Sequence, residues 1–167
     1  MAKIPDPRAG LVFRYRYLRI WQYRRGEQVG KERPCCILLP LKPGQLVTGN
    51  PLHDETQRSV VSRDVAEEGD VLILLFQSDP PAADQIGLEL TTDDKHYVGL
   101  MADAPSYVIV SEINIDKWPN GDMCLIPGRP AAFSYDRPLS GPVLSRVMKA
   151  FLKVQAQRKV MLLVRHL

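Results

Sequence analysis

The sequence predicts a small protein of the mostly β or α+β class, organised as a barrel of short strands followed by one helix. Apolar residues alternate or run together in short segments bounded by turn residues, which is typical of β-strands. Fourteen prolines interrupt the 167 residues at close intervals, and a helical period appears only in the last third of the chain. The length fits a single domain over residues 1–167.

The first predicted strand covers residues 11–18, where the two faces alternate strictly. The odd positions carry apolar and aromatic side chains, and Arg14 and Arg16 lie on the other face. Residues 19–33 break this period and are expected to form a long basic loop that bears aromatic residues. Further strands, the first of them apolar on both faces, are expected at residues 34–41, 70–77, 86–90 and 107–110.

Residues 42–70 mix turn residues, polar residues and one short apolar run, so we expect an extended loop or small hairpin inserted between core strands. Apolar residues between Val143 and Leu152 recur at helical spacing and predict a C-terminal helix. Residues 160–167 fit either a last strand or a continuation of that helix. No helical pattern separates the strands, so no parallel strand–helix–strand unit is expected.

Composition argues against several classes of protein. No stretch reaches the roughly 18 apolar residues of a membrane helix, and the first ten residues lack the apolar core of a secretory signal. The three cysteines form no CxxC pair, and the three histidines lie far from any second metal ligand. Glycine-rich phosphate loops and the GxSxG motif are also absent from the sequence. We therefore expect a reduced, cytoplasmic protein without membrane segment, metal or cofactor.

Positive charge is concentrated in residues 8–33, which hold eight bases and two acids, whereas the remainder has three more acids than bases. A basic patch on a mildly acidic body fits the footprint of a polyanion. A solvated loop without a partner would have the same composition. Trp21 and Tyr23 within the patch offer rings that can stack on unpaired bases, or Trp21 covers the core.

Arg33 stands at the entrance to the second predicted strand. Because Pro34 follows, the backbone of Arg33 is pushed toward an extended conformation. A guanidinium held beside a strand can bind a phosphate in bidentate fashion and stabilise charge that develops on its oxygens. Alternatively, Arg33 pairs with a carboxylate such as Glu32 or Asp79.

Several blocks of the sequence together resemble the MazF/PemK toxins of toxin–antitoxin systems. These blocks are GLVFRYRYL and GKERPCCILLPL, then VLILLFQSDPP, then YVIVSEINIDKWPNGDM followed by the predicted helix. The similarity extends from about Gly10 to Arg165, with residues 42–70 longer than usual. The entry into the second strand is the most specific block, and the tryptophan–proline stretch resembles a PemK-like branch.

The resemblance implies an SH3-like barrel, usually a homodimer, that cleaves single-stranded RNA without metal and is neutralised by an antitoxin peptide. A ribose 2′-hydroxyl attacks the adjacent phosphorus in that reaction and leaves a cyclic phosphate and a 5′-hydroxyl. Arg33 matches the family's arginine, which would stabilise the phosphorane or protonate the leaving oxygen. The residues expected to line the RNA path are Arg14, Arg16, Arg19, Trp21, Arg24, Arg25 and Lys31.

The sequence departs from the family at a threonine near the end of the third strand. Gln77 stands at the aligned position and Ser78 follows it, so Arg33 with Ser78 or Gln77 is the expected catalytic group. Gln77 can donate to a phosphate oxygen but is neither an acid nor a base. Asp116 and Asp122 are either substitutes for the missing group or solvated loop carboxylates.

Two other functions fit the same features. A family member without catalysis would bind nucleic acid or a protein through the same groove, and an interaction module would dock an acidic peptide, such as an antitoxin tail, on its basic loop. The replaced threonine favours binding alone, whereas the retained Arg33 favours a nuclease.

Overall fold

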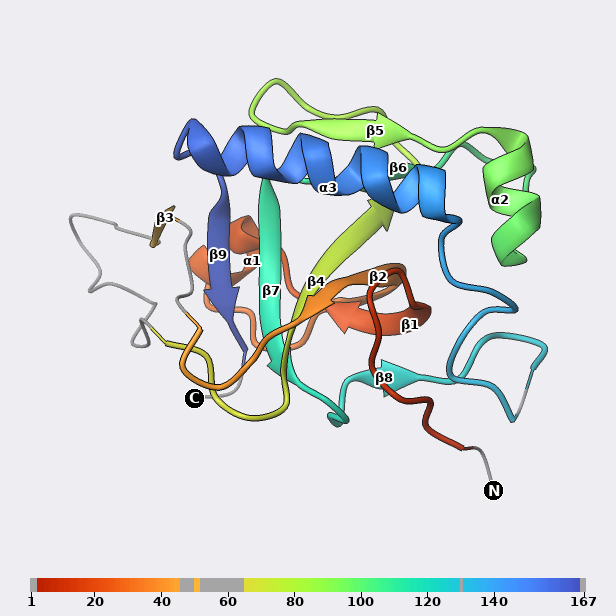
Figure 1. The fold of residues 1–167 in the computed structure, drawn as a ribbon, viewed down its shortest axis with the longest axis horizontal. Coiled ribbons are helices and arrows are strands. Elements are labelled where there is room, and N and C mark those ends of the chain that lie inside the picture. Colours follow the sequence, from red (N-terminus) through yellow and green to blue (C-terminus); the bar gives the residue numbers. More distant parts are fainter. Residues whose placement is uncertain (1–2, 46–49, 52–64, 130, 166–167) are drawn as a thin grey trace.

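A largely antiparallel β-sheet forms the centre of the molecule, with helices on its outside (Figure 1). The computed structural model describes residues 3–45, 50–51, 65–129 and 131–165. The mostly β or α+β class predicted from the sequence is confirmed. The elements within the described residues are β1 (Val12–Tyr17), α1 (Ile20–Arg24), β2 (Lys31–Pro40), β3 (Asn50–Pro51), β4 (Asp70–Gln77), β5 (Gly87–Glu89), α2 (Thr92–Val98), β6 (Tyr107–Ile109), β7 (Glu112–Lys117), β8 (Met123–Cys124), α3 (Gly141–Ala156) and β9 (Met161–Val164).

The strands lie in the order β3-β9-β7-β4-β2-β1-β8 across the sheet. On one side, β4 pairs with two different strands. Its first half pairs with β7, and its last two residues pair with β6. β6 also pairs with β5. Among the described residues no ladder joins β8 to β3, so the pairing by itself does not close a barrel.

The sheet separates two apolar cores, because side chains alternate between its faces. The helix-side core contains Cys36 and Leu74 and lies under α3, which crosses β9, β7 and β4 in Figure 1. The strand-side core contains Phe13, Cys35 and Ile73 on the opposite face. The two adjacent cysteines of β2 therefore point into different cores.

α3 confirms the predicted C-terminal helix and extends it to Gly141–Ala156. Ser140 occupies the N-cap position and Pro142 lies in the first turn, where a missing N–H costs nothing. Val143, Val147 and Phe151 form the buried stripe against the sheet.

Residues 161–164 form a strand rather than a continuation of the helix. β9 pairs parallel with β7, and α3 lies in the connection between them. The expectation that no parallel strand–helix–strand unit occurs is therefore wrong. The helical pattern follows the other strands in sequence, but the last strand returns into the sheet beside β7, and parallel neighbours need such a crossover.

Two short helices were not expected. α1 lies inside residues 19–33, which were predicted to be a loop, and the Gln22 side chain accepts from the Arg19 N–H at 3.0 Å at its start. α2 begins with Thr91, whose hydroxyl accepts from the Asp94 N–H at 3.0 Å, and ends at a left-handed glycine. Both helices are too short to show a helical period in the sequence.

The bounds of the strands differ from the predictions in two places. β2 begins at Lys31 rather than residue 34, because its first residues pair with β1 before the ladder to β4 starts at Cys35. β7 was read as a loop because Glu112, Asn114 and Asp116 alternate with its two isoleucines. In the predicted insertion, Asn50–Pro51 pairs parallel with β9, and residues 46–49 and 52–64 lie outside the described part.

Candidate functional site

A cavity of about 500 Å³ lies where β2 and β4 meet the loop after α2. The structure brings the three predicted catalytic residues together here, since Arg33, Gln77 and Ser78 all line this Arg33 cavity. Arg14, Lys31 and Arg129 line it with positive charge, Glu32 and Asp103 add two acids, and apolar side chains form much of the rest. These apolar residues include Pro34, Phe76, Leu100, Met101, Ile126 and Pro127.

Arg33 is the third residue of β2 and lies opposite Tyr15 of β1. Its side chain is half-buried, and within the described residues its guanidinium makes no hydrogen bond or ion pair. Burial lowers the pKa of Arg33, and the neighbouring charge of Arg19 lowers it further. The predicted pairing with Glu32 is wrong, because Glu32 accepts a 2.7 Å bond from Arg14 Nε. The Nε of Arg33 is buried and unpaired, and within the described residues its two terminal nitrogens make no hydrogen bond and can serve a ligand.

Gln77 is 6 % exposed, and both ends of its amide are engaged by protein. Its Oε1 accepts from Arg19 Nη2 at 2.8 Å, and its Nε2 donates to the Asp79 carbonyl at 2.9 Å and to Gln85 Oε1 at 3.1 Å. Ser78, in contrast, is exposed at the cavity. Of the two residues, Ser78 is the one with a group available to substrate.

The residues predicted to line the RNA path separate into two groups. Arg14 and Lys31 line the cavity, and Arg19 adjoins it through Gln77. The remaining four lie elsewhere: Arg16 donates to the Gly121 carbonyl at 3.4 Å, and Trp21, Arg24 and Arg25 belong to α1 or its end.

Trp21 does not cover the core, since 48 % of it is exposed and the Arg25 guanidinium lies 5.5 Å from its ring centre. Tyr23 packs against the small cluster formed by Leu18, Ile20 and Leu163, so its ring is only partly accessible. Of the two rings expected to stack on unpaired bases, that of Trp21, on the outside of α1, is therefore the more accessible one.

Glu112 belongs to the same charged neighbourhood and was missed in the sequence. Burial raises its pKa, although the Ile20 N–H, which donates to Oε1 at 3.1 Å, and the Tyr17 hydroxyl favour its charged form. Its Oε2 and the Tyr17 hydroxyl face each other but, within the described residues, neither completes a hydrogen bond of standard geometry. Since residues 112–117 were not predicted to form a strand, no pattern in the sequence marked Glu112.

Asp116 is not a solvated loop carboxylate, and Asp122 lies in the turn before β8, where it pairs with Arg165. Asp116 is 1 % exposed on β7 and accepts a 2.6 Å bond from the Tyr15 hydroxyl. Arg165 donates to that hydroxyl at 2.9 Å and lies 3.2 Å from Asp122. Both acids therefore hold β1, β7 and the end of β9 together rather than replace the threonine.

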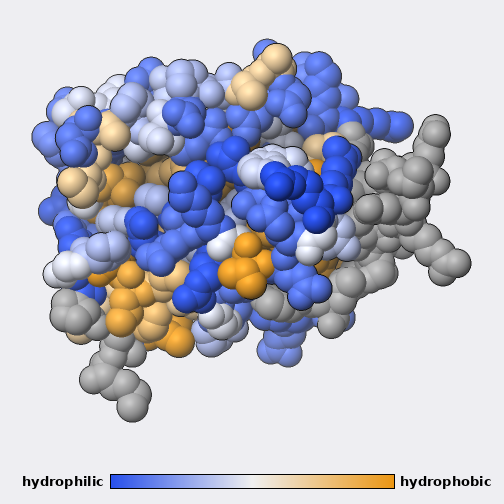
Figure 2. Space-filling model, turned by 180° about the vertical axis from the view of Figure 1, so that it is seen from behind, coloured by the Kyte–Doolittle hydropathy of each residue, from blue (hydrophilic) through white to orange (hydrophobic). Residues whose placement is uncertain are grey.

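The described part of the surface is mostly polar in the rear view (Figure 2). Figure 2 shows a largely hydrophilic surface with hydrophobic residues in separate patches. Among the described residues, no helix combines the length and apolar character needed to cross a membrane.

Comparisons with protein-family models, curated proteins and solved structures give no match to this chain.

Proposed function

We propose that this protein is a metal-independent endoribonuclease that cleaves single-stranded RNA at the Arg33 cavity. The observation that supports this most is the half-buried Arg33, whose guanidinium has no acceptor among the described residues and lines a cavity of about 500 Å³. A planar guanidinium with unused donors is suited to a phosphodiester, which accepts two parallel hydrogen bonds. Lys31 lines the same cavity and would attract a neighbouring phosphate, whereas Arg14 is already bonded to Glu32.

In the proposed reaction the ribose 2′-oxygen bonds to phosphorus while the bond from phosphorus to the 5′-oxygen breaks. The 2′-hydroxyl proton passes to solvent, and the 5′-oxygen receives a proton from Arg33, which solvent then restores. The lowered pKa of Arg33 makes it a better proton donor than an exposed arginine. The Ser78 hydroxyl would donate to a non-bridging phosphate oxygen, and Arg33 would stabilise the charge that grows there.

The resemblance to the MazF/PemK toxins extends this proposal beyond the cavity. It adds closure of the sheet into an SH3-like barrel, a homodimer, a cytoplasmic location and neutralisation by an antitoxin peptide. An acidic segment of such a peptide would compete with RNA for Lys31 and Arg33.

One observation favours a second function, in which the same cavity binds RNA or an acidic protein segment without cleavage. Gln77 stands where the resembled family has threonine, and its amide is occupied by Arg19, Asp79 and Gln85. Ser78 offers a hydroxyl but is not a general base, and among the described lining residues the exposed Asp103 is the carboxylate that stands outside an ion pair. Cleavage and binding must therefore be measured separately.

The test uses purified protein, a long single-stranded RNA and a chelator, with two arginine variants. Arg33→Ala removes the cavity guanidinium, and Arg24→Ala removes an exposed arginine of α1 as a control for lost charge. Cuts with cyclic phosphate ends that persist in Arg24→Ala and vanish in folded Arg33→Ala would support the nuclease. Intact RNA that still binds with strong salt dependence would support binding alone. Unfolding of Arg33→Ala would show that Arg33 is structural.

A further inference from the structure

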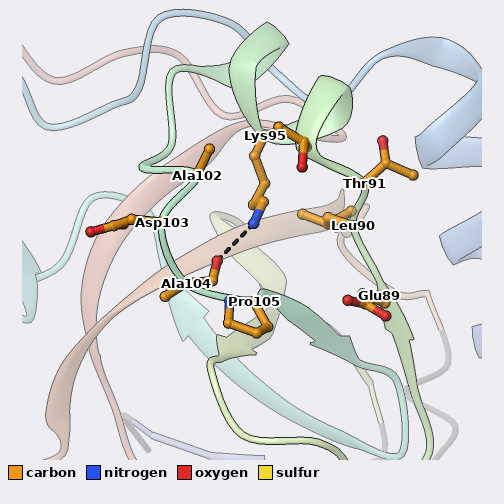
Figure 3. A pocket seen from close by; sticks show the side chains of 9 residues that line it. Glu89, Leu90, Thr91, Lys95, Ala102, Asp103, Ala104 and Pro105 are labelled. Carbon is orange, nitrogen blue, oxygen red and sulfur yellow. Dashed lines mark hydrogen bonds between the residues drawn. The ribbon is translucent and has the colours of Figure 1, made fainter.

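A second cavity of about 500 Å³ opens between the end of β5, the start of α2 and the loop that follows α2 (Figure 3). Its lining includes Glu89, Thr91, Thr92 and Lys95, together with residues 102–105. The loop from 103 to 105 also lines the Arg33 cavity, so it separates two distinct sites. Nothing in the proposed nuclease chemistry uses this second cavity, which we call the Lys95 cavity.

Lys95 is the unusual residue of this cavity, since only 4 % of it is exposed. In Figure 3 its ammonium points between the cavity walls toward the Ala104 carbonyl, to which Nζ donates at 2.7 Å. Within the described residues this is the only hydrogen bond that the ammonium makes, and no carboxylate lies within ion-pair distance of it. An ammonium has three donors, so two of them remain for a ligand.

A buried charge is costly unless it is paired and hydrogen-bonded. One backbone carbonyl supplies a dipole but no opposite charge. An anion in the cavity would supply both, and the hydroxyls of Thr91 and Thr92 on the same wall could donate to it. The size lies in the range of small-molecule sites rather than of peptide grooves.

The rim of the cavity limits the charge of this ligand. Glu89 and Asp103 are exposed acids that line the same cavity as Lys95. A doubly charged phosphate would meet one ammonium and two carboxylates, which is unfavourable. A single carboxylate matches the one ammonium, and a cationic group at the other end of the ligand would match the rim.

We propose that the Lys95 cavity binds a small molecule that carries one carboxylate for Lys95 and a cationic group for Glu89 and Asp103. This inference does not depend on the nuclease. If Lys95 served only to hold the loop after α2 through Ala104, the cavity would show no such preference.

The test is titration of isotope-labelled protein at constant ionic strength, followed through the backbone amide signals of residues 89–92, which line this cavity and not the Arg33 cavity. The probes are acetate, 4-aminobutyrate and inorganic phosphate. We expect saturable shifts with 4-aminobutyrate and acetate, and weaker ones with phosphate. Loss of a charge-assisted hydrogen bond should weaken binding about tenfold or more in Lys95→Met. Shifts that do not saturate, or that are equal in Lys95→Met, would overturn the proposal.

Two further variants keep the test decisive if Lys95→Met does not fold. Glu89→Gln changes an exposed residue and should weaken 4-aminobutyrate while strengthening acetate, because the rim then carries one negative charge less. Arg33→Ala lies outside this cavity and should leave both titrations unchanged. If each probe bound Glu89→Gln as tightly as it binds wild type, the assignment of Glu89 to the rim of the cavity would be contradicted.

Discussion

Arg19 Nη2 donates a 2.8 Å hydrogen bond to Oε1 of Gln77, which joins the start of α1 to the end of β4. The two residues are 58 positions apart in the sequence. This contact explains why the Gln77 side-chain oxygen is not available to a ligand in the Arg33 cavity. Gln77 acts as a positioning residue for Arg19, whose charge in turn lowers the pKa of Arg33.

Gln77→Ala should therefore reduce stability, whereas Ser78→Ala should reduce cleavage. Removal of the buried Gln77 amide takes an acceptor from Arg19 and one of two donors from Gln85 Oε1, and we expect a loss of about 1–3 kcal/mol in the free energy of unfolding. Ser78 is exposed, so its loss should change stability by less than about 0.5 kcal/mol. Urea unfolding and RNA cleavage, measured on both variants, distinguish the roles. The reverse pattern would show that Gln77 contacts substrate.

Arg33→Ala should lower the rate of RNA cleavage by about 10²–10³, the usual cost of one lost donor to transition-state charge. Its guanidinium makes no hydrogen bond or ion pair with the described residues, so the melting temperature should change little. Arg33→Lys keeps the charge but not the two-pronged geometry, and it should recover only part of the rate. Full activity in Arg33→Lys would mean that charge alone is required.

Tyr15→Phe should destabilise the fold without affecting the Arg33 cavity. The hydroxyl donates to Asp116 at 2.6 Å and accepts from Arg165 at 2.9 Å, so its removal leaves two buried charged groups less well paired. We expect a loss of about 1–3 kcal/mol in urea unfolding. Tyr97→Phe is the matched control, because Tyr97 is exposed and the stacking of Arg137 on its ring is retained. If the two variants were equally stable, the hydrogen bonds of Tyr15 with Asp116 and Arg165 would not contribute to the stability of the fold.

Glu112→Gln should remove part of the pH dependence of stability. Burial raises the pKa of Glu112 above its ordinary value of 4.5. The folded protein then holds this proton more tightly than the unfolded chain, so the contribution to stability is full below 4.5 and is lost as pH rises through the raised pKa. The free energy of unfolding of Glu112→Gln, relative to wild type, should therefore increase with pH across that window. Urea titrations from about pH 4 to about pH 7 measure this difference, and a constant difference would contradict the raised pKa.

Helices and strands with a regular pattern of apolar residues were predicted from the sequence. An element whose polar side chains bind partners inside the molecule was not. β4 has the predicted bounds 70–77, because every one of its side chains is buried. α3 follows from its apolar stripe. β7 was missed, because three of its polar side chains satisfy partners inside the molecule, for example Asn114, which bonds the Leu18 backbone in both directions.

The part of the candidate site that lies on two neighbouring strands was predictable from the sequence. Arg33 and Ser78 lie on β2 and just after β4, two predicted strands that pair antiparallel. Glu112 comes from β7, and no local pattern indicates that this strand and α1 meet beside Arg19. The Lys95 cavity was also out of reach, since burial of a lysine depends on the loop that folds over it.

The two thiols of β2, separated by one peptide bond, can serve as reporters of cooperativity between the two cores. Cys35 lies in the strand-side core and Cys36 in the helix-side core. Burial raises the pKa of Cys36 to about 12 and that of Cys35 well above its ordinary value, so alkylation must wait until the core around each thiol opens. If the cores open as one unit, both sulfurs should be labelled at a common rate. Two different rates would mean that a single strand belongs to two independently opening units.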